Sequence, residues 1–182
     1  PSQGAANISM RQLTSIEMQP WWLSWMQLVC RSLPYGRYRL LHALKTSNRA
    51  PYWCRAAARV GGFEFLCHFP DSISREVCFT GIYEPQETLL LQMLLRPGQT
   101  FVDVGANWGY HALVAANLVG KTGRVICLEP DPFIAALLRQ NLERNQLDQV
   151  EMQQLAAASA QGTMPWNTFD IVGGNWGTGQ ML

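Results

Sequence analysis

The residues best suited to chemistry lie in one short segment near the middle of the chain. The run V-D-V-G-A-N-W-G, residues 102–109, places a carboxylate, Asp103, inside an otherwise apolar stretch and two glycines, Gly105 and Gly109, behind it. Glycine lets a backbone turn tightly and approach a ligand. A buried carboxylate is costly unless it is paired or hydrogen-bonded. We therefore expect Asp103 to bind the amides of its own loop and to order the surroundings of a ligand.

A second acidic residue, Glu129, follows the apolar run at 125–128 and lies 24 residues after Gly105. At the end of a second strand, such a residue is placed to accept hydrogen bonds from a ribose diol. It could instead cap the helix that begins near Pro132, but Asp131 is better placed to do so. The spacing therefore favours a ribose-binding role for Glu129.

The ligand predicted by this pattern is a nucleoside without a pyrophosphate. A dinucleotide site needs G-x-G-x-x-G, and here Asn107 and Tyr110 stand where the second and third glycines belong. The second glycine lets a pyrophosphate approach the helix, so its replacement argues against NAD and FAD. A phosphate-binding G-x-x-x-x-G-K-[ST] loop is also missing from the sequence. S-adenosylmethionine fits what remains.

The elements that must position these residues alternate between strand and helix. The expected order is a strand over 100–104, a helix to Val119, a strand over 124–128, a helix to Arg144 and a strand over 149–156. This order is typical of an α/β fold with a parallel sheet. The first strand is apolar at successive positions, which predicts burial on both faces.

Upstream of this unit the patterns predict helices and a hairpin. A helical pattern runs from Gln12 to Leu44 with a break at Pro34 and Gly36. Alternating apolar residues at 63–69 predict a strand, which we expect to pair with a returning strand at 76–79. Glu84 and Pro85 open a further helix, whose expected apolar face is formed by Leu89, Leu90, Met93 and Leu94.

Three tryptophans stand close together in the first helical stretch: Trp21, Trp22 and Trp25. They could form a lipid-facing belt or a partner surface. Surface helices normally bury an apolar stripe, so we favour packing between helices.

Four segments together resemble the FkbM-type class I methyltransferases, over about residues 61–160. The matching segments are G-I-Y-E-P at 81–85, R-P-G at 96–98, F-V-D-V-G-A-N-W-G-Y at 101–110 and E-P-D-P at 129–132. Asn141 and Asn145 also suit the family pattern. The resemblance departs after the third strand, because the family's further strands and its D-x-E-G segment do not follow.

The resemblance implies a class I Rossmann-like sheet with S-adenosyl-L-methionine as methyl donor. It implies O-methylation of a hydroxyl on a sugar, glycan or secondary metabolite. The cofactor-binding residues it implies are Tyr83, Glu84, Asp103, Gly105, Ala106, Asn107, Gly109, Tyr110, Glu129 and Pro130, with Tyr83 and Glu84 near the methionine end. The expected organisation is a helical extension (1–60), a hairpin and helix (61–99) and the N-terminal half of a cofactor domain (100–182).

No residue is assigned as the catalytic base. His111 follows the loop and could accept a proton, but a histidine that begins a helix is more often a packing or capping residue. Cys54, Cys67, His68 and Cys78 match no paired metal-binding spacing, so buried thiols and no metal are expected.

Composition narrows the classes of function. A formal net charge of +1 gives no basic footprint for nucleic acid, and no apolar run reaches the ~20 residues of a membrane span. Five scattered cysteines suit reduced thiols in a cytoplasmic protein. We expect the 182 residues to be a fragment that does not turn over alone; oligomeric state is not predicted. The alternatives are a non-catalytic nucleoside-binding module and an interaction protein that acts through its tryptophan-rich helices.

Overall fold

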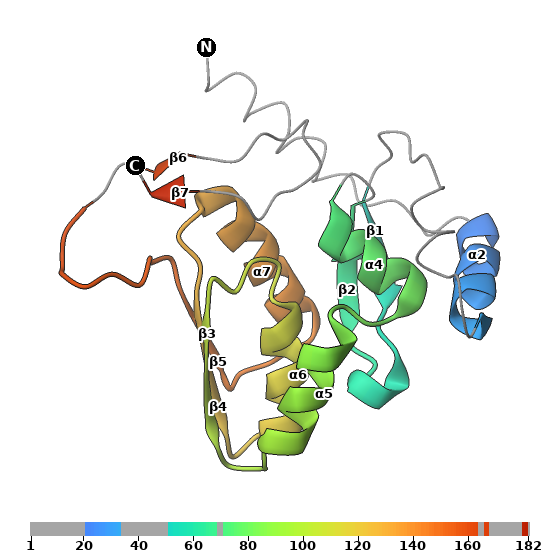
Figure 1. Cartoon of the computed structure of the whole chain (residues 1–182), viewed down its shortest axis with the longest axis horizontal. Coiled ribbons are helices and arrows are strands. Elements are labelled where there is room, and N and C mark those ends of the chain that lie inside the picture. The colour runs from blue at the N-terminus through green and yellow to red at the C-terminus, as the bar shows by residue number, and fades with distance from the viewer. Residues whose placement is uncertain (1–20, 34–50, 69–70, 164–165, 168–179, 182) are drawn as a thin grey trace.

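The computed structural model describes residues 21–33, 51–68, 71–163, 166–167 and 180–181 (Figure 1). The first half holds α2 (Trp21–Ser32), β1 (Tyr52–Arg55), the short 3-10 helix η1 (Ala58–Val60), β2 (Glu64–Cys67), α4 (Ser72–Thr80) and α5 (Pro85–Leu94). The second half holds β3 (Thr100–Val104), α6 (Tyr110–Val119), β4 (Arg124–Leu128), α7 (Pro132–Arg144), β5 (Val150–Gln153), β6 (Trp166–Asn167) and β7 (Gln180–Met181).

The central unit is a parallel sheet in the order β3-β4-β5. Right-handed crossovers between successive neighbouring strands bring their helices to one face of a sheet. Figure 1 shows α6 and α7 together on one side of the three strands. The predicted alternation of strand and helix over residues 100–156 is confirmed, and so is the α/β class with its preceding helix and hairpin.

The prediction that β3 is buried on both faces is wrong for the described part of the chain. Val102 and Val104 are 50% and 61% exposed, whereas Phe101 and Asp103 are half-buried. Side chains alternate across a strand, so the face that carries the two valines points away from α6. An apolar run therefore identified the strand correctly but overestimated how much of it is covered.

The expected hairpin has a different second strand. β2 pairs antiparallel with β1, which lies upstream, so that Cys67 stands opposite Tyr52. The segment expected to return as a strand, 76–79, belongs instead to helix α4. The Asp71 side chain accepts a hydrogen bond from the backbone amide of Ser74 at 2.7 Å and so caps this helix. The hairpin therefore crosses the predicted boundary at residue 60, although the division into domains remains a prediction.

The N-terminal helical prediction is described in part. Helix α2 lies within the expected stretch, and the rest of that stretch lies outside the described residues. The prediction that the tryptophans pack between helices is wrong for Trp21 and Trp25, whose side chains are 78% and 65% exposed. Leu23 and Cys30 provide the buried face of α2 instead. Trp22 is partly buried against the core.

Helix α5 turns a different face toward the core than the sequence predicted. Leu89, Leu90, Met93 and Leu94 are all more than half exposed, whereas Leu91 and Leu95 pack against the core. The expected apolar face of this helix is therefore wrong. Within the described ranges, no helix has the length and apolar character needed to cross a bilayer.

Asn141 of α7 and Asn145, which follows the last residue of that helix, fasten the hairpin to the central unit. Asn141 Oδ1 accepts a hydrogen bond from the backbone amide of Leu66 at 2.8 Å. Asn145 Oδ1 accepts from the Glu64 amide at 2.9 Å, and its Nδ2 donates to the Glu64 carbonyl at 2.7 Å. The side-chain amides therefore bind the backbone of β2 as a neighbouring strand would.

Candidate cofactor site

A hollow of about 270 Å³ lies at the carboxyl end of β3. In open α/β sheets this edge is where ligands bind. Its walls come from α4, the turn before α5, the end of β3, the loop that follows and the start of α6. The lining residues are Ile73, Tyr83, Glu84, Asp103, Gly105, Ala106, Asn107, Trp108, Tyr110 and His111.

The loop after β3 is held in a conformation that suits its residue types. Gly105, Asn107 and Gly109 have φ values of +75°, +51° and +86°, a region that glycine and asparagine tolerate best. At Gly109 a Cβ atom would lie 2.2 Å from the Cδ1 atom of Leu138. The amides of Gly105 and Ala106 both donate to the Leu128 carbonyl, at 2.8 and 3.0 Å. The loop is thereby fixed across the end of β4.

Glu129 supports the same loop from the end of β4. Its Oε2 accepts a hydrogen bond from the Asn107 amide at 2.9 Å, and its Oε1 accepts from the Asp131 amide at 3.0 Å. Burial raises the pKa of this carboxyl, and the two backbone amides oppose that rise. Asp131 caps α7 through the amides of Phe133 and Ile134, as the sequence predicted. The contact between Glu129 and the loop was not foreseen, because spacing alone does not show it.

Asp103 does not play the loop-binding part expected of it. The amides of Gly105 and Ala106 donate to Leu128, that of Asn107 donates to Glu129, and the next two donate within the loop. Asp103 Oδ2 is buried with no hydrogen-bond partner among the described residues. Burial raises the pKa of Asp103, while His111 and the Ala112 amide lower it. Asp103 therefore lines the hollow and keeps one carboxylate oxygen that no described protein group binds.

His111 and Glu84 face each other across this hollow. Their Nε2 and Oε2 atoms are 3.6 Å apart, slightly beyond a hydrogen bond. Within the described structure, His111 Nε2 is buried and has no hydrogen-bond partner. Glu84 adopts a φ of +42°, an uncommon value for a residue other than glycine. Sequence reasoning raised His111 as a possible base but could not show this pairing.

Tyr110 forms the inner wall. Its side chain is buried, and its hydroxyl lies 3.2 Å from Thr88 Oγ1. The rings of Tyr83 and Phe63 each meet it edge-on at 5.8 Å between centroids. The wall therefore depends on the hairpin as well as on α5. Sequence reasoning missed this support, along with Ile73 and the fully buried Trp108.

A second hollow of about 870 Å³ is lined by Pro130 and residues 154–162, which follow β5. Pro130 adjoins Glu129, and Glu129 is bonded to Asn107 of the first hollow. The expected site residues are thus distributed in a row. Seven line the first hollow, Gly109 shapes its loop, Glu129 lies between the hollows and Pro130 borders the second.

The first hollow has a negative character. Glu84 and Asp103 line it, and none of the described residues that line it is a lysine or an arginine. Glu129 stands behind its loop. Such a site attracts a cationic group and disfavours a phosphate.

Comparison with known proteins agrees with a methyltransferase. The family model described as protein-L-isoaspartate(D-aspartate) O-methyltransferase (PCMT) matches residues 70–171. The chain is 36% identical over 93 residues to a protein-L-isoaspartate O-methyltransferase of Methanopyrus kandleri, covering 50% of this chain and 41% of that protein. A second such enzyme, from Methanothrix thermoacetophila, is 43% identical over 58 residues, 32% of this chain and 28% of its own length. The chain therefore spans less than half the length of these relatives.

The fold is also similar to the solved structure of a SAM-dependent O-methyltransferase from Thermotoga maritima, with a TM-score of 0.37 and 27% sequence identity. The match covers 41% of this chain and 29% of the Thermotoga maritima chain. The class I methyltransferase assignment and the S-adenosyl-L-methionine cofactor are confirmed. The comparisons do not show the narrower FkbM-type family. Because the family model matches more than half of the chain, the chain belongs to the protein-L-isoaspartate(D-aspartate) O-methyltransferase (PCMT) family.

Proposed function

We propose that the protein transfers a methyl group to an acceptor oxygen and that this chain supplies its cofactor site. The observation that carries the proposal is the carboxylate-lined hollow at the end of β3. The methionine part of S-adenosyl-L-methionine carries a sulfonium and an ammonium group, and both are cations. Glu84 and Asp103 are placed to attract them, and Asp103 Oδ2 has no hydrogen-bond partner among the described residues.

The row of predicted residues suits an extended ligand of this kind. The first hollow, at about 270 Å³, is small for a whole nucleoside with its amino-acid tail, and the second begins beside Pro130. Tyr83 and Glu84 would face the methionine end, with the loop of Gly105, Ala106, Asn107 and Gly109 beneath it. Glu129 would accept from the ribose diol with the lone pairs that its two backbone donors leave. Tyr110 would wall the site.

The bound cofactor supplies an already activated methyl group. The protein's own contribution is orientation of the acceptor and exclusion of water. The fixed loop and the buried Tyr110 wall provide rigid surfaces for that purpose.

The acceptor we propose first is the carboxyl group of an isoaspartyl residue in a protein. The PCMT family match supports this choice. A carboxylate is ionised at neutral pH, so the reaction would need no base from the enzyme. This acceptor replaces the sugar or metabolite hydroxyl as our leading hypothesis.

A hydroxyl acceptor stays as the second candidate because of His111. A hydroxyl must lose a proton on methylation, and His111 Nε2 lies at the hollow, 3.6 Å from Glu84. The FkbM-type resemblance of the four sequence segments points to the same acceptor class.

One assay separates these hypotheses. The complete gene product and the 182-residue chain are incubated with methyl-labelled S-adenosyl-L-methionine and either an isoaspartyl peptide or a panel of sugars and metabolites. Mild alkali releases methanol from a methyl ester and leaves a methyl ether intact. We expect an alkali-labile product from the complete protein, and transfer by the 182-residue chain alone would contradict the fragment prediction.

His111→Ala tests the second candidate. It should leave ester formation intact and abolish ether formation. Binding of S-adenosylhomocysteine without transfer by the complete protein would favour the non-catalytic module. If neither transfer nor binding occurs, the proposed function is refuted.

A further inference from the structure

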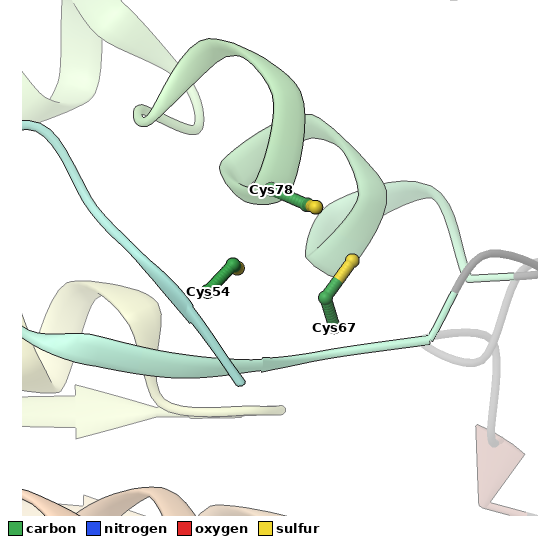
Figure 2. A group of neighbouring side chains, drawn as sticks. All are labelled: Cys54, Cys67 and Cys78. Carbon is green, nitrogen blue, oxygen red and sulfur yellow. The ribbon is translucent and has the colours of Figure 1, made fainter. Parts of the chain in front are cut away.

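Three cysteines from three different elements meet between the hairpin and α4. Cys54 lies on β1, Cys67 on β2 and Cys78 on α4, and their sulfur atoms all lie within 4.8 Å of one another. Figure 2 shows the three side chains in the space between the hairpin and the helix. All three are buried free thiols. Their separations in sequence follow no metal-binding pattern, so only the fold brings them together.

The strand register explains the convergence. In the β1–β2 pair, Cys54 stands opposite Phe65, and Cys67 lies two residues further along β2. Two residues along a strand return to the same face, so both cysteines project from one side of the hairpin. Helix α4 packs on the hairpin and contributes Cys78 from its last turn.

The spacing suits a shared ion better than a disulfide. At a Zn–S distance of ~2.3 Å, two sulfurs bound to one ion lie ~3.8 Å apart in a tetrahedral site and ~4.0 Å apart in a trigonal one. The observed limit of 4.8 Å is within about 1 Å of both. Diagonal neighbours such as Cys54 and Cys67 have Cα atoms ~7–8 Å apart, further than a disulfide spans.

Two side chains of α2 bring hydrogen-bond donors beside the cluster. Arg31 donates to the carbonyls of Arg55 and Cys78, at 2.7 and 3.2 Å, which places a cation beside the cluster. Gln27 Nε2 lies 3.5 Å from the sulfur of Cys78.

A fourth thiol lies nearby on α2. Cys30 is fully buried. Helix α2 packs against α4. Cys30 is therefore our candidate for a fourth ligand if the ion requires one.

We infer that Cys54, Cys67 and Cys78 bind one thiophilic d10 metal ion, either Zn(II) or Cu(I). Each bound thiol exchanges its proton for the ion, so no oxidation state changes. Trigonal coordination by three sulfurs would satisfy Cu(I), whereas structural Zn(II) takes four ligands. The ion would tie the hairpin to α4, whose C-terminal end leads directly into Tyr83 and Glu84 of the cofactor hollow.

The test uses the reduced chain, freed of metal, with Zn(II), Co(II) as a spectroscopic probe, and Cu(I) buffered by a chelator. We expect one ion per chain, a sulfur-to-cobalt charge-transfer band, and a higher Tm with metal. Cys67→Ser or Cys78→Ser should weaken binding at least ~100-fold. The matched control is Cys127→Ser, which removes a buried thiol on β4 and should leave binding unchanged. Weakening by Cys30→Ser for Zn(II) alone would identify the ion as zinc.

A second measurement needs no variant and so does not depend on their folding. Alkylation of each thiol in the wild-type chain is followed by mass spectrometry with and without the ion. Metal should protect Cys54, Cys67 and Cys78 and leave the reactivity of Cys127 unchanged. Failure of the wild-type chain to bind any of the three ions, or equal protection of Cys127, would overturn the inference.

Discussion

Replacing Asn141 should damage both the fold and the cofactor loop, because this side chain joins three separate parts of the molecule. Asn141 lies on α7. Its Oδ1 accepts a hydrogen bond from the Leu66 amide of β2 at 2.8 Å, and its Nδ2 donates to the Trp108 carbonyl of the loop at 2.8 Å. The side chain is fully buried, so water cannot take over its bonds in the native state. Asn141→Ala therefore removes a partner from two interior backbone groups at once.

The expected cost follows from those two groups. A buried donor or acceptor left without its partner costs ~1–3 kcal/mol, so two such groups give a loss of roughly 2–6 kcal/mol in the free energy of unfolding. Asn145→Ala is the matched control at the C-terminal end of the same helix. Its side chain binds Glu64 of the hairpin and the Asn141 carbonyl, but not the loop, and it is half-buried, so water can replace its bonds. We expect that variant to lose about 1–2 kcal/mol.

Urea unfolding of the wild-type chain and of both variants measures these losses by linear extrapolation. Calorimetric titration with S-adenosylhomocysteine then separates the two roles, because only Asn141 bonds to the loop. Affinity should fall more for Asn141→Ala than for Asn145→Ala. The reasoning is refuted if Asn141→Ala loses less than ~1 kcal/mol, or if Asn145→Ala proves the more harmful of the two.

Three further perturbations test other parts of the site. Gly109→Ala should lower the free energy of unfolding, measured in urea, by at least ~2 kcal/mol, because the new Cβ would lie 2.2 Å from the Cδ1 atom of Leu138. At Gly105 a Cβ meets nothing within 4 Å, so Gly105→Ala should cost only the ~1 kcal/mol of its positive φ. Equal losses for the two variants would contradict this reasoning. Burial raises the pKa of Asp71 from 3.8 to about 6, so the stability it confers is full below pH ~4 and lost as pH rises through ~6. Asp71→Asn should remove up to ~3 kcal/mol of this change in unfolding free energy with pH. If the pH–stability curves of the wild-type chain and the variant run parallel, this expectation is refuted. Asp103→Asn should raise the free energy of unfolding at pH 8, because it removes a buried carboxylate. The same variant should weaken S-adenosylhomocysteine binding tenfold or more in calorimetry. An unchanged affinity would show that Asp103 is not part of the cofactor site.

Local signals explain why the elements from α5 to β4 and α7 could be predicted from sequence. Helices α5 and α7 begin at residues whose chemistry marks a start, Pro85 and the capping Asp131. Strands β3 and β4 are short, largely apolar runs bounded by turn residues. The hairpin could not be predicted in this way. Its partner strand, 52–55, lies upstream of the expected one, and the apolar run at 76–79 reads equally well as strand or helix.

Burial was harder to predict than secondary structure, for a physical reason. An apolar side chain such as Val104 or Leu90 shows that an element can be covered, but only the placement of its neighbours decides which face is covered. Both residues are more than half exposed among the described elements. The site shows the same limit. Glu129 was correctly singled out from its position at a strand end, but its bond to the Asn107 amide depends on two loops meeting in space.

The hydrogen bond from the Asn107 amide to Glu129 also affects how the site would bind its ligand. The loop holds Asn107 at a positive φ, and the cost of that conformation is met by the protein's own contacts with Leu128 and Glu129. Since folding already fixes the loop, binding need not order it, and more of the contact energy can be realised as affinity. Glu129 would therefore serve twice, as a support for the loop and as an acceptor for the ribose. An affinity lost on changing this residue would contain both contributions, and its size alone would not measure the ribose contact.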